Sequence, residues 1–289
     1  MKNSLVLIWA ILLFSACEFK DIQIAQIPEL EQPIEASVKI SEPVAEETEE
    51  NVEATEVIEN DDKDTIEVLL NKDDLPENIK NVEYAAEMIA GNQKVFETKV
   101  EYPQLKIPEG EINPINQKIN ETIAEHALEA ANEFELQAKN DFELGYMMGH
   151  YSYDQNYSIS YAGDYYLSIL FYDYQYTGGA HPNGFYMSKT FDLINGETVN
   201  IDHFLLPGGM EEVQKIVRRE LRVKLGDAAD ESWLQDGTAI NQENYSTFAL
   251  EEDALIVYIN SYQVAPYAAG PTIVRIPVED LEGYILKDF

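Results

Sequence analysis

The 289-residue chain has few basic residues, a single cysteine and one long apolar run. Its 19 lysines and arginines face 54 aspartates and glutamates, which gives a formal net charge of −35 at pH 7. This charge argues against a nucleic acid as partner, because binding to phosphates requires cations that displace their counterions. Anionic lipid headgroups are disfavoured for the same reason. The lone Cys17 excludes an internal disulfide and a cysteine-based metal cluster. A basic partner, or a neutral one such as a glycan, suits the charge better.

The apolar run lies at the amino terminus, at residues 5–14, and follows Lys2. Ten residues span about 15 Å as a helix, half of a hydrocarbon core of ~30 Å, so the run is typical of a signal peptide and not of a membrane span. Ser15 and Ala16 precede Cys17 and resemble a bacterial lipobox, although Phe14 stands where that motif prefers leucine. We therefore expect residues 1–17 to be a lipoprotein signal peptide. Lipidation of Cys17 would hold the chain on a membrane of the bacterial cell envelope, outside the cytoplasm. An ordinary signal peptide that contains a cysteine is the alternative.

Residues 18–64 form a strongly acidic segment with 16 acidic residues, three lysines and one aromatic residue. Such a composition cannot offset the entropy of ordering, so we expect a disordered tether. Residues 65–91 are of mixed composition. They are compatible either with a short strand followed by a helix, at residues 84–89, or with a continuation of the tether.

We expect the folded part to begin near Asn92. Apolar and polar residues alternate over 96–102, which predicts a half-buried strand that ends at Pro103. Asn113 and Pro114 are typical of a helix start, and apolar residues at intervals of three and four predict a long helix to about Lys139. His126 lies beside the apolar stripe, where we expect it on the helix surface or at the edge of the core and not as a ligand.

An antiparallel β region rich in tyrosine follows, and 11 of the 18 tyrosines lie between Tyr146 and Tyr186. The pattern predicts strands at 157–162, 165–176, 185–193 and 197–201, with a turn at Gly163-Asp164 and a type I′ hairpin at Asn195-Gly196. Tyrosine suits a sheet because its ring packs while its hydroxyl stays in water. Sheet packing is one interpretation of this enrichment, and a recognition surface made of outward-facing rings is the other.

A second unit begins at Asp202. A helix is predicted at 210–225, and its carboxyl-terminal half holds a basic patch, which we attribute to internal ion pairs and not to a phosphate site. Strands are predicted at 247–250, 254–259 and 272–276, and a closing helix at 279–285. The sequence thus predicts an α+β fold of antiparallel sheets with packed helices. Two successive domains, 92–201 and 202–289, would follow the tether.

Three stretches carry a more specific signal: YQYTGGAHPNG at 174–184, FDLINGE at 191–197 and YQVAPYAAGP at 262–271. Together they resemble the extracytoplasmic domain pair shared by RsiV-type anti-sigma factors and the amino-terminal region of PdaC-type deacetylases. The resemblance covers about residues 94–289 and implies an α+β fold exposed on a bacterial cell envelope. In RsiV-type proteins this region is a receptor for lysozyme. In PdaC-type proteins it accompanies an enzyme that modifies the cell wall, while most relatives have no assigned activity.

Two departures limit what the resemblance implies. Only a few residues precede the apolar run, so we expect no cytoplasmic segment and no control of a sigma factor. Deacetylase chemistry needs a metal-bound water held by a carboxylate and paired histidines. Thr190-Phe191-Asp192 begins like the aspartate motif of that enzyme but continues differently, and the four histidines are scattered. We therefore expect a hairpin strand at this point, and neither a metal nor another cofactor.

Two loops hold the candidate site. In the first, glycines beside His181 suit either a tight turn or a ligand cradle, and Asp173 lies upstream. The second loop, APYAAGP at 265–271, either packs across the two domains or takes part in binding. The candidate binding residues are Tyr176, Gly178, Gly179, His181, Asn183, Tyr262, Pro266 and Tyr267. The sequence favours a lipid-anchored, non-catalytic binding module for a cationic lysozyme-like muramidase or a cell-wall component such as peptidoglycan. A peptidoglycan-modifying hydrolase or deacetylase-like enzyme centred on His181 is the alternative.

Overall fold

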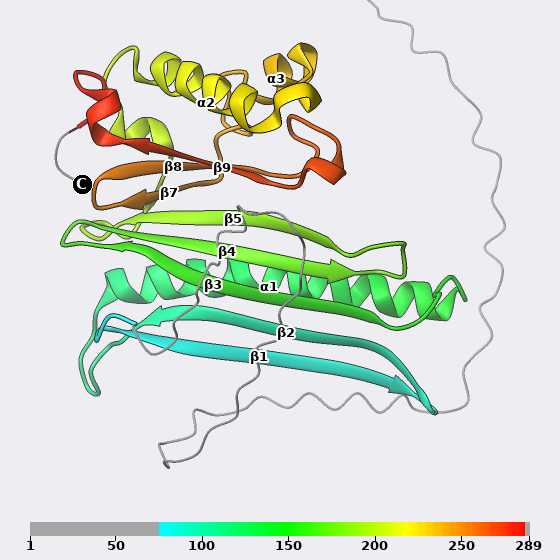
Figure 1. Ribbon diagram of the computed structural model, residues 1–289. Helices are drawn as coiled ribbons and strands as arrows, with labels where there is room; N and C mark the ends of the chain where they lie inside the picture. Colours follow the sequence, from blue (N-terminus) through cyan, green and yellow to red (C-terminus); the bar gives the residue numbers. More distant parts are fainter. Residues whose placement is uncertain (1–74, 287–289) are drawn as a thin grey trace, which may run out of the picture. The chain divides into compact units, whose positions relative to one another are not determined.

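The computed structural model describes residues 75–286 of the chain (Figure 1). The expected signal peptide with Cys17 and the expected tether lie outside the described residues. Within them, no helix combines the length and the apolar character that a membrane span requires.

The first half of the fold is a six-stranded sheet in which the strands follow one another in sequence order. Neighbouring strands are antiparallel except β2 and β3, which run parallel over Phe96–Val100 and Tyr151–Gln155. The strands are β1 (Ile79–Ala90), β2 (Gln93–Leu105), β3 (Tyr151–Ala162), β4 (Tyr166–Tyr176), β5 (Asn183–Asp192) and β6 (Thr198–Val199).

Helix α1 (Pro114–Glu143) connects the two parallel strands and covers one face of this sheet (Figure 1). It begins as the sequence predicts, because the Asn113 side chain accepts a hydrogen bond of 3.0 Å from the backbone N–H of Asn116. Its buried stripe, with Ile119, Ile123 and Phe134, packs on the strands that flank the crossover. His126 lies at the edge of this core with its ring 5.1 Å from that of Phe171, the second of the two places that the sequence allows.

Three local predictions in this region are wrong. Residues 84–89 are neither helix nor tether, because Ile79–Ala90 form a single strand paired along its length with β2. The folded part therefore begins before Asn92. Pro103 does not end β2, since β3 pairs with β2 only as far as Val100 and the missing N–H of the proline costs no bond there. The turn at Asn195-Gly196 is wider than a two-residue hairpin: the N–H of Asp192 bonds to the carbonyl of Glu197 at 2.9 Å.

The second half is a three-stranded antiparallel sheet with helices on one side. Its central strand β8 is buried throughout, and its residues alternate between two cores. Leu255, Val257 and Ile259 belong to the core that includes α2, whereas Ile256 and Tyr258 pack against β4 and β5. The elements are η2 (Ile201–Phe204), α2 (Gly209–Leu225), η3 (Gly226–Ala228), α3 (Glu231–Gly237), β7 (Phe248–Glu251), β8 (Ala254–Ile259), η4 (Tyr267–Ala269), β9 (Thr272–Pro277) and η5 (Val278–Leu281).

In this second half one sequence prediction is wrong, one helix was not predicted, and one prediction agrees with the structure. The closing helix predicted at 279–285 is only a short 3₁₀ turn, η5, and Ile285 instead bridges to Leu205. Helix α3 was not predicted, although the Asp230 side chain caps it by accepting from the N–H groups of Ser232 and Trp233. The basic residues at the end of α2 find partners within the chain, with Arg222 bound to both carboxylate oxygens of Glu231 at 2.8 Å.

The two sheets contact each other through the face of the large sheet that α1 leaves uncovered. Leu170 of β4 packs there against Ala249 and Ile256. Polar bonds tie the backbones together as well: the Asn260 side chain accepts from the N–H of Tyr186 at 2.8 Å and donates to its carbonyl at 2.9 Å. The predicted α+β class with sheets and packed helices is confirmed. The boundaries 92–201 and 202–289 remain a prediction.

We predict that Asn260→Ala lowers the free energy of unfolding by about 2–4 kcal/mol. The substitution leaves the N–H of Tyr186 unpaired in a partly buried place, at a cost of about 1–3 kcal/mol. It also removes the shorter of two bonds to the Tyr186 carbonyl, worth about 0.5–1.5 kcal/mol, and leaves only that from the Thr247 hydroxyl at 3.5 Å. Urea unfolding followed by circular dichroism measures the change. Asn132→Ala, on the exposed face of α1, is the control and should shift stability by less than about 0.5 kcal/mol. Equal effects of the two substitutions would contradict the prediction.

Candidate functional site

Two loops that are far apart in the sequence meet beside the contact between the sheets. The first joins β4 to β5 and the second joins β8 to β9. The ring of His181 stacks on that of Tyr267, with centroids 4.1 Å apart and planes 15° apart. The Tyr267 hydroxyl donates a hydrogen bond of 2.7 Å to the carbonyl of Pro182, and the Tyr262 ring lies 5.6 Å from the Tyr267 ring. We call His181, Tyr262 and Tyr267 the aromatic patch.

A glycine with positive φ and a hydrogen bond from a side chain to the backbone shape the first loop. Gly178 has φ +81°, in the left-handed region that favours glycine, and a Cβ there would already touch the Tyr151 ring at 3.4 Å. The Tyr176 hydroxyl donates to the carbonyl of Gly179 at 3.2 Å. Among the predicted site residues, Tyr176, Gly178 and Gly179 therefore shape the turn, which supports the turn interpretation for them.

Tyrosines below the patch fill the space between the two sheets. The rings of Tyr172 and Tyr186 lie 5.0 Å apart, and that of Tyr258 lies 5.1 Å from Tyr186. A Cβ on Gly184 would come within 2.3 Å of the Tyr172 hydroxyl, so any other residue there would displace that ring. Burial, together with the nearby Tyr186, Tyr267 and Tyr174, raises the pKa of Tyr172. For these residues the packing interpretation of the tyrosine enrichment holds.

Tyr262 differs from the other tyrosines in two ways. Its side chain is 61% exposed. Its φ of +70° is the only positive φ of a non-glycine residue in the described range. A bulky residue in this region costs on the order of 1–3 kcal/mol, and such strain clusters at functional sites. Tyr262 is therefore the residue of the patch that folding explains least.

The environment of His181 favours a contact surface over a proton relay. Its Nδ1 lies 2.9 Å from the carbonyl oxygen of Pro182, and a carbonyl can only accept, so Nδ1 carries the hydrogen. Asp173, upstream in the sequence, does not bond to this ring. Within residues 75–286 no carboxylate orients His181 as a catalytic base requires.

The remaining predicted residues lie at the ends of elements. Asn183 is exposed and begins β5, where it pairs with Gln175. Pro266 is exposed and directly precedes η4. The structure thus brings together His181, Tyr262 and Tyr267 from both predicted loops. The underlying Tyr172 and Tyr186 were not singled out from the sequence, where they appear only as two members of a tyrosine-rich stretch.

A second group of polar side chains lies deep in the large sheet. The Tyr153 hydroxyl donates to Asp173 at 2.5 Å, and both residues are at most 1% exposed. Gln155 stands directly opposite Asp173 in the β-ladder, and within the described residues its Nε2 and the Asp173 Oδ1 have no hydrogen-bond partner. Burial raises the pKa of Asp173 to about 6, partly opposed by the bond from Tyr153. No substrate reaches a carboxyl that is fully buried, so we assign this group to the fold.

The described residues contain no set of three or more His, Cys, Asp and Glu side chains that could hold a metal ion. Thr190 and Asp192 lie at the end of β5, in the strand that the sequence predicts. Burial and the charge of Lys189 lower the pKa of His126 to about 4.

Comparisons with known proteins identify two domains. Residues 89–184 match the family model "Deacetylase PdaC", and residues 202–279 match the model "Protein of unknown function (DUF3298)". The chain therefore contains a PdaC domain followed by a DUF3298 domain, which confirms the resemblance to PdaC-type proteins.

Individual relatives and solved structures are more distant. The chain is 26% identical over 224 residues to the peptidoglycan-N-acetylmuramic acid deacetylase PdaC of Bacillus subtilis, covering 77% of this chain and 45% of that protein. It is 27% identical over 112 residues to esterase Rv3036c of Mycobacterium tuberculosis, covering 38% of this chain and 48% of the esterase. The chain thus spans about half the length of the curated relatives that it matches.

Two crystal structures of DUF3298 proteins share the fold. The protein from Pseudomonas aeruginosa aligns with a TM-score of 0.53 and 18% identity, over 74% of this chain and 96% of that one. The protein from Bacteroides fragilis aligns with a TM-score of 0.53 and 17% identity, over 72% and 93%. At these identities the likeness concerns the fold alone.

We predict that Asp173→Asn removes a pH-dependent loss of stability. The folded chain keeps the Asp173 proton up to about pH 6, whereas the unfolded chain loses it near pH 4. The stability contribution of this group therefore falls as the pH rises from about 4 to about 6, by about 3 kcal/mol in total. The variant should match the parent near pH 4 and exceed it near pH 7 in urea unfolding.

The difference in stability between the parent and the variant isolates Asp173, because the contribution of His126 is the same in both proteins. His126 also contributes with the opposite sign. Its lowered pKa favours the neutral ring, so its contribution is lost as the pH falls from about 6.5 to about 4 in both proteins. Stability curves of parent and variant that run parallel from pH 4 to pH 7 would contradict the assignment.

Proposed function

We propose that the chain is a lipid-anchored binding module of the bacterial cell envelope whose aromatic patch binds a cationic protein of the lysozyme kind, without catalysis. The observation that carries this proposal is Tyr262, which is exposed and strained above the stacked rings of His181 and Tyr267.

The shape and chemistry of the patch suit a protein partner. Tyrosine is enriched among the residues that dominate binding energy at protein interfaces, because its rigid ring offers a large contact area at a small loss of entropy. The patch is preorganised: the Pro182 carbonyl accepts from both Tyr267 and His181, which links the two loops before any partner arrives. Preorganisation lowers the entropic cost of association.

The charge of the chain favours a cationic partner. Residues 65–289 carry 38 acidic and 15 basic side chains. On the exposed side of α1, glutamates recur at every fourth position: Glu121, Glu125, Glu129 and Glu133. Like charges at this spacing destabilise a helix by about 0.2–0.5 kcal/mol per pair, so helix formation does not explain them. A negative field of this kind speeds the encounter with a basic protein and is screened by salt.

The proposed location rests on the resemblance and on the amino terminus. The related PdaC acts, by its name, on peptidoglycan, a polymer of the cell wall. The small residues before Cys17 resemble a lipobox. Lipidation of Cys17 would keep the binding surface on the envelope, where a muramidase meets its substrate.

A catalytic role is the second candidate, because two of the relatives bear the names of enzymes, a deacetylase and an esterase. The chain covers less than half of each of them. In this alternative, His181 would serve a peptidoglycan-modifying hydrolase or deacetylase-like reaction. Turnover of peptidoglycan fragments by the full chain, abolished in a folded His181→Ala variant, would favour it over the binding proposal.

The test is binding of hen egg-white lysozyme to the full chain, measured by calorimetry over about 0.05–0.3 M salt. We expect saturable binding that weakens as salt rises. Tyr262→Ala should weaken it at least tenfold, because a central aromatic contact contributes about 2 kcal/mol or more. Tyr165→Ala is the matched control, since Tyr165 is 57% exposed and lies next to the opposite end of β4. This control should leave the affinity unchanged.

Tyr262→Gly separates binding from folding. Glycine adopts the positive φ without strain, so the free energy of unfolding should rise by about 1 kcal/mol while binding weakens as in the alanine variant. If both Tyr262 variants bind lysozyme like the parent, attraction between opposite charges alone would account for the interaction and the proposed site would be wrong.

A further inference from the structure

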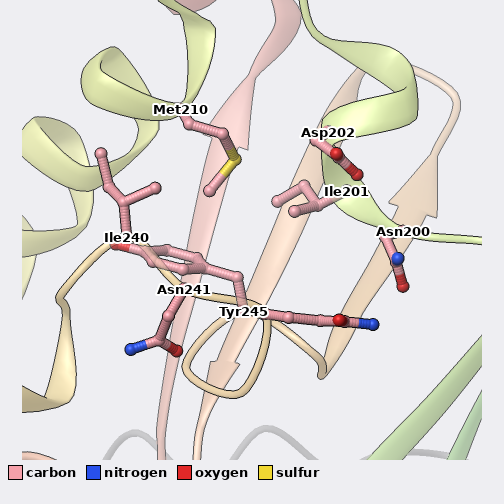
Figure 2. A pocket seen from close by; sticks show the side chains of 8 residues that line it. Asn200, Ile201, Asp202, Met210, Ile240, Asn241 and Tyr245 are labelled. Atoms are coloured by element: carbon pink, nitrogen blue, oxygen red, sulfur yellow. The ribbon is translucent and has the colours of Figure 1, made fainter. Parts of the chain in front are cut away.

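A pocket of about 210 Å³ opens in the second half of the fold, and none of its lining residues belongs to the aromatic patch. Figure 2 shows the side chains that line it. Its walls come from the turn around Asn200–Asp202, from the first turn of α2 and from residues 240–245, which follow α3. The volume is below the ~300–1,000 Å³ of sites for drug-sized ligands. The pocket therefore admits one small ring and not an extended polymer.

One side of the pocket is apolar. Ile201 and the Tyr245 ring, 3% and 2% exposed, form its inner wall, and Met210 reaches in from α2 (Figure 2). Ile240 lines the same pocket but remains 45% exposed. A large apolar side chain left in water beside a concave surface gains free energy when a ligand covers it.

The other side carries polar groups that the fold does not use. Asn200 precedes η2 but its side chain makes no capping bond, and within the described residues the side chains of Asp202 and Gln242 make no hydrogen bond. Asn241 accepts from the N–H of Asn244 with its oxygen, which leaves its NH₂ group available. The pocket thus offers amide donors and acceptors and one carboxylate, and none of its lining residues is basic.

The walls are fixed in place. The Tyr245 hydroxyl donates to the carbonyl of Thr238 at 3.0 Å, and the Asn244 side chain donates to the carbonyls of Asp236 and Ala239. Gln263 donates to the carbonyl of Asn244 at 3.1 Å. A ligand therefore meets a formed pocket and does not have to order the loop.

From this arrangement we infer that the pocket binds a single pyranose ring of a neutral sugar. Sugar hydroxyls donate to the Asp202 carboxylate and exchange hydrogen bonds with Asn200 and Gln242. The less polar face of the ring covers Ile240 and Met210. A phosphate or carboxylate ligand would find no cation and would face Asp202. This inference does not rest on the proposed protein partner, because no residue of the pocket belongs to the aromatic patch.

The test is titration of the full chain with N-acetylglucosamine, followed by ligand-observed NMR and calorimetry. For a small ligand in a small pocket we expect a Kd on the order of 1 mM. Asp202→Asn should weaken binding about tenfold by removing a charge-assisted hydrogen bond. Ile240→Ser should weaken it severalfold. A soluble glycan fragment ending in the same ring should compete if the source of the ring is a polymer.

Two controls keep the result specific. Asp280→Asn removes an exposed aspartate of the same half that does not line the pocket, and it should bind like the parent. Tyr262→Ala should also bind the sugar like the parent, so that failure of the lysozyme experiment and failure of this one are separate results. Absence of saturable binding up to about 50 mM sugar, or equal affinity of the parent and the Asp202 and Ile240 variants, would overturn the inference.

Discussion

The contact between the two sheets is the constraint on which the rest of the structure depends. Strand β8 is buried on both faces: one packs against α2 and the other against the large sheet. Because neither face meets water, the strand reads as a continuous apolar run. The Asn260 side chain, one residue past β8, bonds to both backbone groups of Tyr186 and so fixes where the loop to β9 begins.

That fixed starting point places Tyr262 and Tyr267 beside His181. The stack of His181 on Tyr267 and their shared acceptor at Pro182 then hold the two loops together. The stability of the interface supports the strained conformation of Tyr262, because a rigid surrounding structure can maintain a backbone that isolated residues avoid. Of the two tyrosines of the patch, Tyr262 thus remains the more exposed without holding the two loops together.

Patterns with a strong local cause could be predicted from the sequence, and long-range pairings could not. The cap at Asn113, the stripe of α1 and the apolar run of β8 each follow from neighbouring residues. Strand β1 was missed because alanine, glutamate and methionine at 84–89 favour a helix, while pairing with β2 decides otherwise. Both loops of the patch were identified, but their stacking depends on sheets that meet across about 80 positions of sequence. The positive φ of Tyr262 had no signal in residue type, since glycine or asparagine usually marks such a position.

The central claim is that the aromatic patch is the surface that a cationic envelope partner covers. Hydrogen–deuterium exchange of the full chain, with and without saturating lysozyme, tests it most directly. The account predicts slower exchange of backbone amides in loops 177–184 and 260–271, and unchanged exchange at the far end of the β3–β4 hairpin. Protection confined to the glutamate-bearing face of α1, with both loops unaffected, would contradict it.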